Sequence, residues 1–212
     1  MFDRIARLVP VFAILFFSVL MLRLTLPYLS FRTDVDFLLT KQGIIHITIW
    51  RIAFYTHITT ALLVLISGGL QFIRPVMIHY RNVHRWLGRV YVVLVLFFAG
   101  PSGLIMGYYG NGGVPAKISF MIQATLWIIF TYLAYYYIRH KKLKLHTRFM
   151  IMSYALTLAA ITLRTYALLL PHVSTLHGKE AYIFLAWSSW VPNLIIAEIL
   201  IRNGFMRKLR RA

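Results

Sequence analysis

Long runs of apolar residues alternate with short polar stretches along the 212-residue chain. Six of these runs reach the roughly 20 residues that a helix needs to cross the hydrocarbon core of a bilayer. We place the six predicted helices at 8–28, 52–73, 86–107, 118–138, 149–170 and 181–201. The residues outside these runs are too few for a soluble domain. The pattern therefore predicts an all-α fold, a polytopic membrane bundle of six transmembrane helices that forms a single domain over residues 1–212.

Basic residues gather on one side of this predicted bundle. Most of the 23 lysines and arginines fall at the N-terminus, in the loops 74–85 and 139–148, and in the C-terminal tail. Lys and Arg are enriched in cytoplasmic loops. We therefore expect both termini to face the cytoplasm.

Composition agrees with a membrane protein and changes the meaning of the charge. Hydrophobic residues make up 60% of the chain and charged residues 13%, whereas soluble proteins have about 45–50% and about 25%. In this setting the net charge of +18 indicates topology and attraction to anionic lipids rather than nucleic-acid binding. The absence of cysteine excludes disulfides, thiolate metal sites and iron–sulfur clusters.

Three predicted helices carry a stripe of small and polar residues at helical spacing. The stripes are His57, Ala61, Val64, Gly68 and Gln71; His84, Gly88, Tyr91, Val95, Ala99 and Ser102; and His146, Met150, Ser153, Thr157 and Arg164. Such faces turn towards other helices, and packing explains them as well as ligand binding does. Arg164 has no evident carboxylate partner, which leaves a bound anion, a carbonyl-rich pocket or snorkelling to the interface.

His84 and His146 are the candidate ligands of a cofactor. Each lies just before its predicted helix, and the two helices run in the same direction, so we expect both imidazoles at the same depth. Two facing neutral imidazoles can ligate a haem iron, and Gly88 would leave room for the macrocycle. An interfacial role, a metal site or a quinone site remain alternatives. The basic residues close enough to pair with propionates are Arg85, Arg89 and Arg148.

A second site near the opposite face would be centred on His57, about one turn inside that face. Its second ligand is less evident, because the fourth predicted helix offers Gln123 and no histidine. His172, just beyond Pro171, is the best candidate. A hydrogen bond between helices is the alternative role for His57.

Motifs of common enzymes are missing from the chain. There is no H-E-x-x-H, no Walker loop, no G-x-S-x-G and no dinucleotide fingerprint. Histidine is almost the only general acid or base available. The chain is therefore at most a component of a membrane oxidoreductase.

Four motifs in order resemble the uncharacterised bacterial membrane-protein family DUF2306, a domain of unknown function. They are Phe54-Tyr55-Thr56-His57 with Gly68-Gly69-Leu70-Gln71-Phe72; His84-Arg85-Trp86-Leu87-Gly88-Arg89-Val90-Tyr91; His146-Thr147-Arg148-Phe149-Met150 leading to Leu163-Arg164; and Ser189-Trp190-Val191-Pro192-Asn193 with Glu198. The resemblance spans roughly residues 50–202. It implies a multi-pass protein of the bacterial inner (cytoplasmic) membrane and no established activity.

The His84-Arg85-Trp86-Leu87-Gly88 stretch also resembles a helix start in six-helix transmembrane cytochromes b, which move electrons from ascorbate. That resemblance implies two bis-histidine haems, held by the second and fourth helices and by the third and fifth. His84 and His146 match the second of these pairs. The fourth helix lacks the histidine that the other haem requires.

These observations favour a component of electron transfer that uses haem b, with a quinone as the other possible cofactor. A non-catalytic subunit that packs against a larger membrane complex is the main alternative. A small-solute transporter is the third, in which Gly68-Gly69 and Pro192 would break helices at a midplane site.

Overall fold

The computed structural model describes the backbone of residues 2–204 and the side chains of Phe12 and of residues 15–204. Over this range it contains helices and no strand, which confirms the all-α prediction. The long helices are α1 (Phe2–Thr25), α2 (Thr48–Leu70), α6 (Val114–Arg139) and α7 (Leu143–Val173). The others are η1 (Leu26–Ser30), η2 (Asp36–Lys41), α3 (Arg74–Ile78), α4 (Arg81–Leu94), η3 (Val95–Ala99), α5 (Gly100–Tyr108), α8 (Gly178–Ser188) and α9 (Val191–Arg202).

Five helical segments are long and apolar enough to cross a membrane: α2, α4–η3–α5, α6, α7 and α8–α9. They correspond to the second to sixth predicted helices. In the first predicted segment the apolar helical stretch is Leu15–Ser30, which is shorter. Large apolar side chains such as Phe97, Leu168 and Ile195 are more than half exposed, as expected where lipid covers a protein. The structure thus shows a multi-pass membrane protein with five candidate spans. That the first segment, 8–28, also crosses the membrane stays a prediction.

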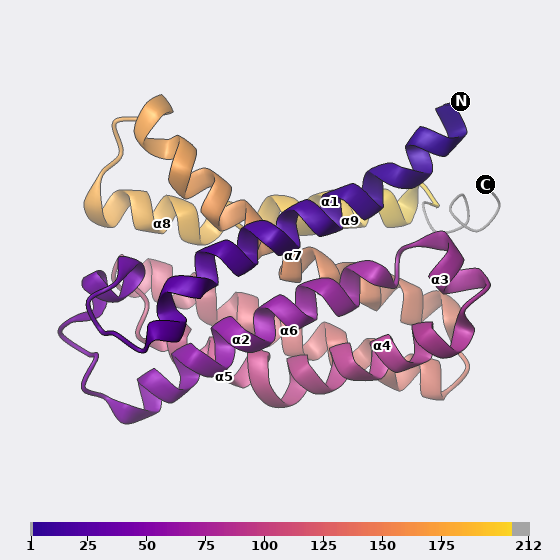
Figure 1. Cartoon of the computed structure of the whole chain (residues 1–212), viewed down its shortest axis with the longest axis horizontal. Coiled ribbons are helices and arrows are strands. Elements are labelled where there is room, and N and C mark those ends of the chain that lie inside the picture. The colour runs from indigo at the N-terminus through magenta and orange to yellow at the C-terminus, as the bar shows by residue number, and fades with distance from the viewer. Residues whose placement is uncertain (1, 205–212) are drawn as a thin grey trace.

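Four spans form a central bundle. Helix α2 packs against α4 and α5, α5 against α6, α6 against α7, and α7 against α2. Helix α1 lies on α2, and α8–α9 lies on α6 and α7, so that both run above the four central helices in Figure 1. We call the end that holds α3, residues 140–142 and the end of α9 the basic end. The opposite end holds residues 31–47, 109–113 and 174–177 (Figure 1).

Two helices begin earlier than their hydrophobic pattern predicts. The third predicted helix starts at Arg81 rather than 86, and the fifth at Leu143 rather than 149. Their first turns carry Arg and Lys, so an apolar run does not detect them, although these residues favour helix. His84 and His146 were predicted to lie just before their helices, and this is wrong. Each is the fourth residue of its helix.

The α4–η3–α5 span contains an irregular turn that presents a backbone hydrogen-bond acceptor to the bundle interior. Residues Val95–Ala99 form a π-helical turn, and Pro101 follows in the first turn of α5. Proline has no N–H to donate, and a π turn shifts the backbone pairing. The Ala99 carbonyl in this region accepts a hydrogen bond from His57 Nδ1 at 3.0 Å.

Of the helix breaks expected at Gly68-Gly69 and near Pro192, the structure shows the second and not the first. Helix α2 continues through Gly68 and Gly69 to Leu70, so these glycines do not interrupt it. The last span does break at Ser189 and Trp190, and Pro192 lies in the first turn of α9, a position that proline tolerates. The Trp190 side chain donates to Ser119 Oγ at 2.9 Å and ties this break to α6.

Candidate functional site

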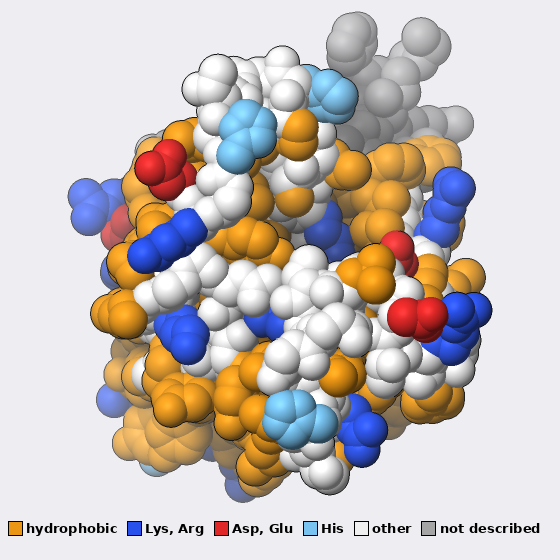
Figure 2. Space-filling view, turned by 90° about the vertical axis from the view of Figure 1, so that its left-hand side faces the viewer, with side chains coloured by type: hydrophobic (Ala, Val, Ile, Leu, Met, Phe, Trp, Pro, Cys, Tyr) orange, Lys and Arg blue, Asp and Glu red, His pale blue; other side chains and the backbone are white. Residues whose placement is uncertain are grey.

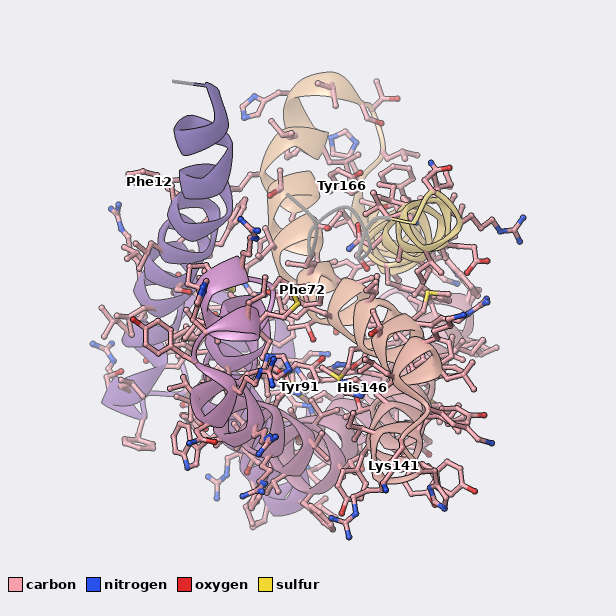
Figure 3. The ribbon with its side chains drawn as sticks, turned by 90° about the vertical axis from the view of Figure 1, so that its right-hand side faces the viewer. Phe12, Phe72, Tyr91, Lys141, His146 and Tyr166 are labelled. Atoms are coloured by element: carbon pink, nitrogen blue, oxygen red, sulfur yellow. The ribbon has the colours of Figure 1, made fainter. Side chains whose placement is uncertain are left out.

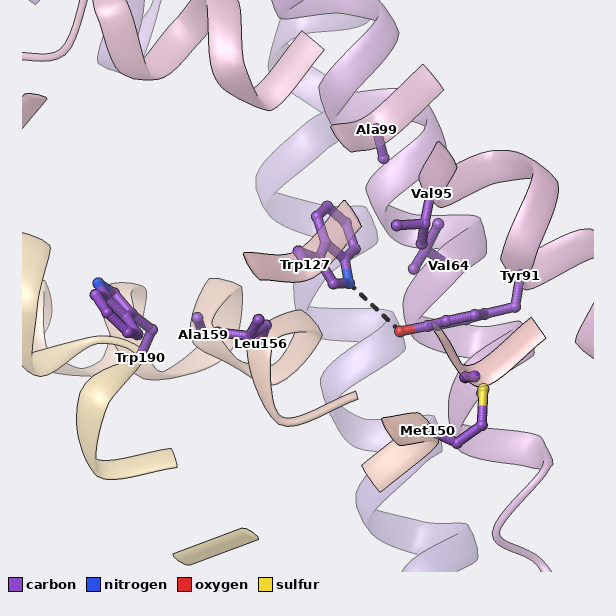
Figure 4. Packing of buried hydrophobic residues seen from close by; sticks show 10 residues of the cluster. Val64, Tyr91, Val95, Ala99, Trp127, Met150, Leu156, Ala159 and Trp190 are labelled. Atoms are coloured by element: carbon purple, nitrogen blue, oxygen red, sulfur yellow. Dashed lines mark hydrogen bonds between the residues drawn. The ribbon is translucent and has the colours of Figure 1, made fainter. Parts of the chain in front are cut away.

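The three polar stripes predicted from the sequence face the bundle interior. Val64 and Gly68 on α2 are buried, and so is Gln71 directly after it. Tyr91 and Ser102 are buried on α4–α5, and Ser153 and Thr157 on α7. Figure 4 shows Tyr91 reaching across this interior towards Trp127, whose indole N–H it accepts at 3.4 Å. The stripes are therefore a common core of α2, α4–α5 and α7.

A network of hydroxyl groups joins three helices in this core. Thr131 on α6 donates to the Trp127 carbonyl at 2.7 Å. That bond uses the hydroxyl proton of Thr131. Ser153 must therefore be the donor in the 2.7 Å hydrogen bond between Ser153 Oγ and Thr131 Oγ1. For the same reason Tyr91 must donate to Ser153 Oγ at 2.7 Å. Thr157 Oγ1 lies 2.9 Å from the Tyr91 oxygen and 3.3 Å from the Ser153 carbonyl, and either of these can accept its proton. The hydroxyl protons of Thr131, Ser153 and Tyr91 thus each have a determined acceptor, and the network sets how α4 lies against α7.

We expect Tyr91→Phe to destabilise the folded protein by about 1 kcal/mol, a usual value for a side-chain hydrogen bond between membrane helices. The ring still fills the core, so the cost comes from the lost hydroxyl. Thermal unfolding of the purified variant measures this. Tyr132→Phe is the control, since Tyr132 on α6 is 52% exposed. An equal loss in the two variants would contradict this role for the network.

Helix register brings His84 and His146 to the same level. Tyr91 contacts Ser153 between two helices that run in the same direction. Each histidine lies seven residues before its contact residue. Seven residues are two turns, so both histidines lie on the contact faces and about 10 Å closer to the basic end. Figure 3, a view onto that end, shows His146 and Tyr91 in the middle of the bundle and Lys141 at its edge.

His146 is held in a defined tautomer. Its Nδ1 lies 2.9 Å from the Ala134 carbonyl of α6. A carbonyl only accepts hydrogen bonds, so Nδ1 carries the proton and Nε2 carries the lone pair. Metal-ligating histidines are commonly oriented by a hydrogen bond of this kind. Both His84 and His146 are half-buried.

Other residues assigned to this site lie differently from the prediction. The room beside Gly88 holds the buried amide of Gln71, whose Oε1 would lie 3.0 Å from a Cβ at position 88. Arg85 and Arg89 are exposed on α4. Arg148 pairs with Glu198 at 3.0 Å, so its assignment to a propionate was wrong.

At the opposite end, His57 packs against α5. Its Nδ1 lies 3.0 Å from the Ala99 carbonyl and 3.3 Å from Ser102 Oγ, which gives the hydrogen bond between helices that was the alternative reading. Gln123 is half-buried on α6, and His172 is exposed in the last turn of α7. Arg164 donates to the Ala160 carbonyl at 3.0 Å, one turn back on its own helix.

Sequence analysis missed a polar cluster at the opposite end, the face shown in Figure 2. Lys41 is 4% exposed, and its Nζ donates at 2.6 Å to the Tyr109 carbonyl and to Asn111 Oδ1. The Asn111 amide donates to Thr40 and Tyr182. The cluster therefore joins η2, the turn after α5, and α8. The only signal for it was an asparagine in a glycine-rich turn. Burial lowers the pKa of Lys41 to about 8, and nearby Lys117 adds to the effect.

We expect the stability of the protein to rise with pH above about 8 because of Lys41. Below pH 8 the ammonium is charged in both states, and the cost of burying it is fully present. Between about 8 and the ordinary value of 10.5, the folded protein has lost this proton while the unfolded chain retains it. Stability then increases by up to about 3 kcal/mol. Thermal unfolding from pH 7 to pH 10 measures the effect.

Lys41→Met should lack this pH dependence relative to the unaltered chain. Lys179→Met is the control, because Lys179 is exposed at the same end. If the two variants respond to pH in the same way, the rise does not come from Lys41.

No group of three or more His, Cys, Asp or Glu side chains that could hold a metal ion occurs in the described part of the chain. A family model described as "Predicted membrane protein (DUF2306)" matches residues 54–201, well over half of the sequence. Searches of curated proteins and of solved structures gave no significant match.

Proposed function

Since the chain belongs to the DUF2306 family of predicted membrane proteins, whose description names no activity, we propose a function from its own geometry. The protein is a membrane component of electron transfer that binds one b-type haem between His84 and His146. The basic end faces the cytoplasm, the membrane is the inner membrane of a bacterium, and six helices cross it, with both termini inside.

The helix register is the observation that supports this proposal. The contact of Tyr91 with Ser153, extended by two turns of helical repeat, supports positions for His84 and His146 on facing surfaces of two helices. His146 is oriented by the Ala134 carbonyl so that Nε2 keeps its lone pair. Two imidazoles at one level of a helical bundle are a suitable ligand set for haem iron.

The residues of this end would each contribute to binding and orientation. A haem held here would supply one-electron transfer. His84 and His146 would hold its iron, and the Gln71 amide lies beside Gly88 at the same end. His57 faces α5, and the fourth span has Gln123 and no histidine, so we propose one haem rather than two.

The basic end supports the proposed orientation. Among the side chains that the structure describes at this end, Glu198 is the acidic one, and Arg148 and Arg202 bind it. The other exposed or half-buried cations there would meet anionic lipid on the cytoplasmic side. They are Arg74, Arg81, Arg85, Arg89, Arg139, Lys141, Lys142 and Lys144.

A non-catalytic subunit of a larger membrane complex is the second candidate. Close packing favours it, because Gln71 fills the space beside Gly88 and the hydroxyl network closes the core above it.

The visible spectrum of the full chain, purified in detergent after expression with added haem precursor, tests the proposal. We expect a Soret band, low-spin α and β bands after reduction, and one haem per chain. A colourless protein that stays colourless when haem is supplied would rule out the haem function. Co-purification of a stoichiometric membrane partner with such a colourless chain would support the subunit.

A further inference from the structure

Two lysines lie close together at the end of the bundle opposite the basic end. The buried ammonium of Lys41 donates to the Tyr109 carbonyl and to Asn111 Oδ1, which are both neutral groups. Lys117, the fourth residue of α6, lies close enough to Lys41 for the two charges to repel each other. Two neighbouring positive charges, one of them buried, are costly unless an opposite charge offsets them.

The described part of the chain supplies no such opposite charge. The ion pair at this end joins Arg32 and Asp34. Among the described residues, no carboxylate pairs with Lys41 or Lys117. The two ammonium groups are therefore suited to an anion that comes from outside the chain.

An apolar groove lies beside the two lysines, between the start of α2 and the end of α5. Its volume is about 290 Å³. Ile49 and Tyr108 in its wall are 58% and 60% exposed, so the groove opens on the outside of the bundle, where lipid covers the protein. The residues that line it are Ile49, Leu104, Ile105, Tyr108 and Tyr109.

The lysines lie at the end of this groove that reaches the membrane surface. Lys117 Nζ lies 5.7 Å from the centre of the Tyr108 ring, and Lys41 Nζ lies 2.6 Å from the Tyr109 carbonyl. Tyrosines are enriched at the level of the lipid headgroups, and Leu104 lies one helical turn deeper on α5. In Figure 2, which looks onto this end, blue side chains lie among the white backbone, next to orange apolar surface. Positive charge at the surface and an apolar groove below it match the headgroup and the acyl chain of a phospholipid.

We propose that an anionic phospholipid binds here, with its phosphate at Lys117 and one acyl chain in the groove. Lys41 is 4% exposed, so it acts on the phosphate through its charge and through the turn that it holds. The phosphate supplies the negative charge that the two lysines lack, and the chain covers Ile49 and Tyr108. The proposal needs only the membrane setting and is independent of the haem.

A photoreactive phosphatidylglycerol tests this site. The full chain would be placed in phosphatidylcholine nanodiscs that contain phosphatidylglycerol with a diazirine near the carboxyl end of one acyl chain. Peptide mass spectrometry then locates the labelled residues. We expect labelling to concentrate on Ile49, Leu104 and Ile105 and to fall when unlabelled phosphatidylglycerol is added. Labelling spread evenly over the lipid-facing helices would overturn the proposal, because it indicates unspecific contact with lipid.

Lys117→Met should reduce labelling of the groove about fivefold, the factor for one cation beside anionic lipid. Lys179→Met is the matched control, because it removes an exposed lysine of α8 at the same end, and it should change labelling less than twofold. An equal loss in both variants would count against the site, since it indicates a general charge effect. Competition by free glycerol 3-phosphate as strong as that by phosphatidylglycerol would also overturn the proposal, because the site would then bind a soluble anion.

A second variant leaves both lysines in place and covers the case in which Lys117→Met does not fold. Leu104→Trp fills the groove, so labelling of Ile49 and Ile105 should fall several-fold. Phe97→Trp is its control, because Phe97 lies on the same span, outside the groove, and is 69% exposed. It should leave labelling of the groove unchanged. Unchanged labelling in a folded Leu104→Trp protein would show that no acyl chain occupies the groove.

Discussion

Replacing His146 with alanine should abolish low-spin haem binding by the purified chain. The variant loses the imidazole whose Nε2 is oriented by the Ala134 carbonyl, and no other described histidine occupies the same position on the face of α7. His84→Ala should have the same effect, because the two helices place the two residues at the same level. The optical spectrum after haem addition measures the loss. We expect at least a tenfold decrease in haem retained, a change of more than about 1.4 kcal/mol in binding free energy.

His140→Ala provides the control for His146→Ala. His140 lies at the same end, but it is exposed and bonds the Tyr136 carbonyl of its own helix, so its removal should leave the spectrum unchanged. Free imidazole added to His146→Ala should restore the low-spin bands, because it replaces the missing ligand without changing the fold. A low-spin spectrum in His146→Ala without imidazole would show that the ligand is another residue.

Gly68→Ala should destabilise the protein by about 1–3 kcal/mol, the range for inserting a group into a packed core. A Cβ at this position would lie 2.7 Å from the rings of Tyr154 and Tyr91. Neither ring can withdraw easily. Tyr91 is held by Ser153 and Thr157, and Tyr154 donates to the Leu65 carbonyl at 3.2 Å. The methyl group therefore has to separate α2 from α4 and α7.

Thermal unfolding of the detergent-purified variants measures this effect. Gly43→Ala is a matched control, because a Cβ there meets nothing within 4 Å and its φ is not positive. Its midpoint should stay within about a degree of the unaltered chain. A Gly68→Ala protein as stable as Gly43→Ala would show that α2 does not pack as closely as the structure has it.

The positions of five spans and the inward faces of three of them could be predicted, while the pairing of side chains could not. The stripe from His57 to Gln71 and the stripe from His84 to Ser102 both turned out to face the core. The sequence placed Arg148 beside a propionate, whereas the structure pairs it with Glu198 from another helix fifty residues away. Likewise the sequence indicates only that Lys41 lies in a loop. Its burial depends on a turn nearly seventy residues later in the chain.

The sequence by itself determined the membrane setting, the positions of five spans and the inward faces of three, because the bilayer thickness and the helical repeat act on neighbouring residues. Only the tertiary structure decided where α4 and α7 begin and which partners Tyr91 and Arg148 bind. These depend on how far each helix slides along its neighbours. That register is set by close contacts between distant residues, such as Gly68 with Tyr91.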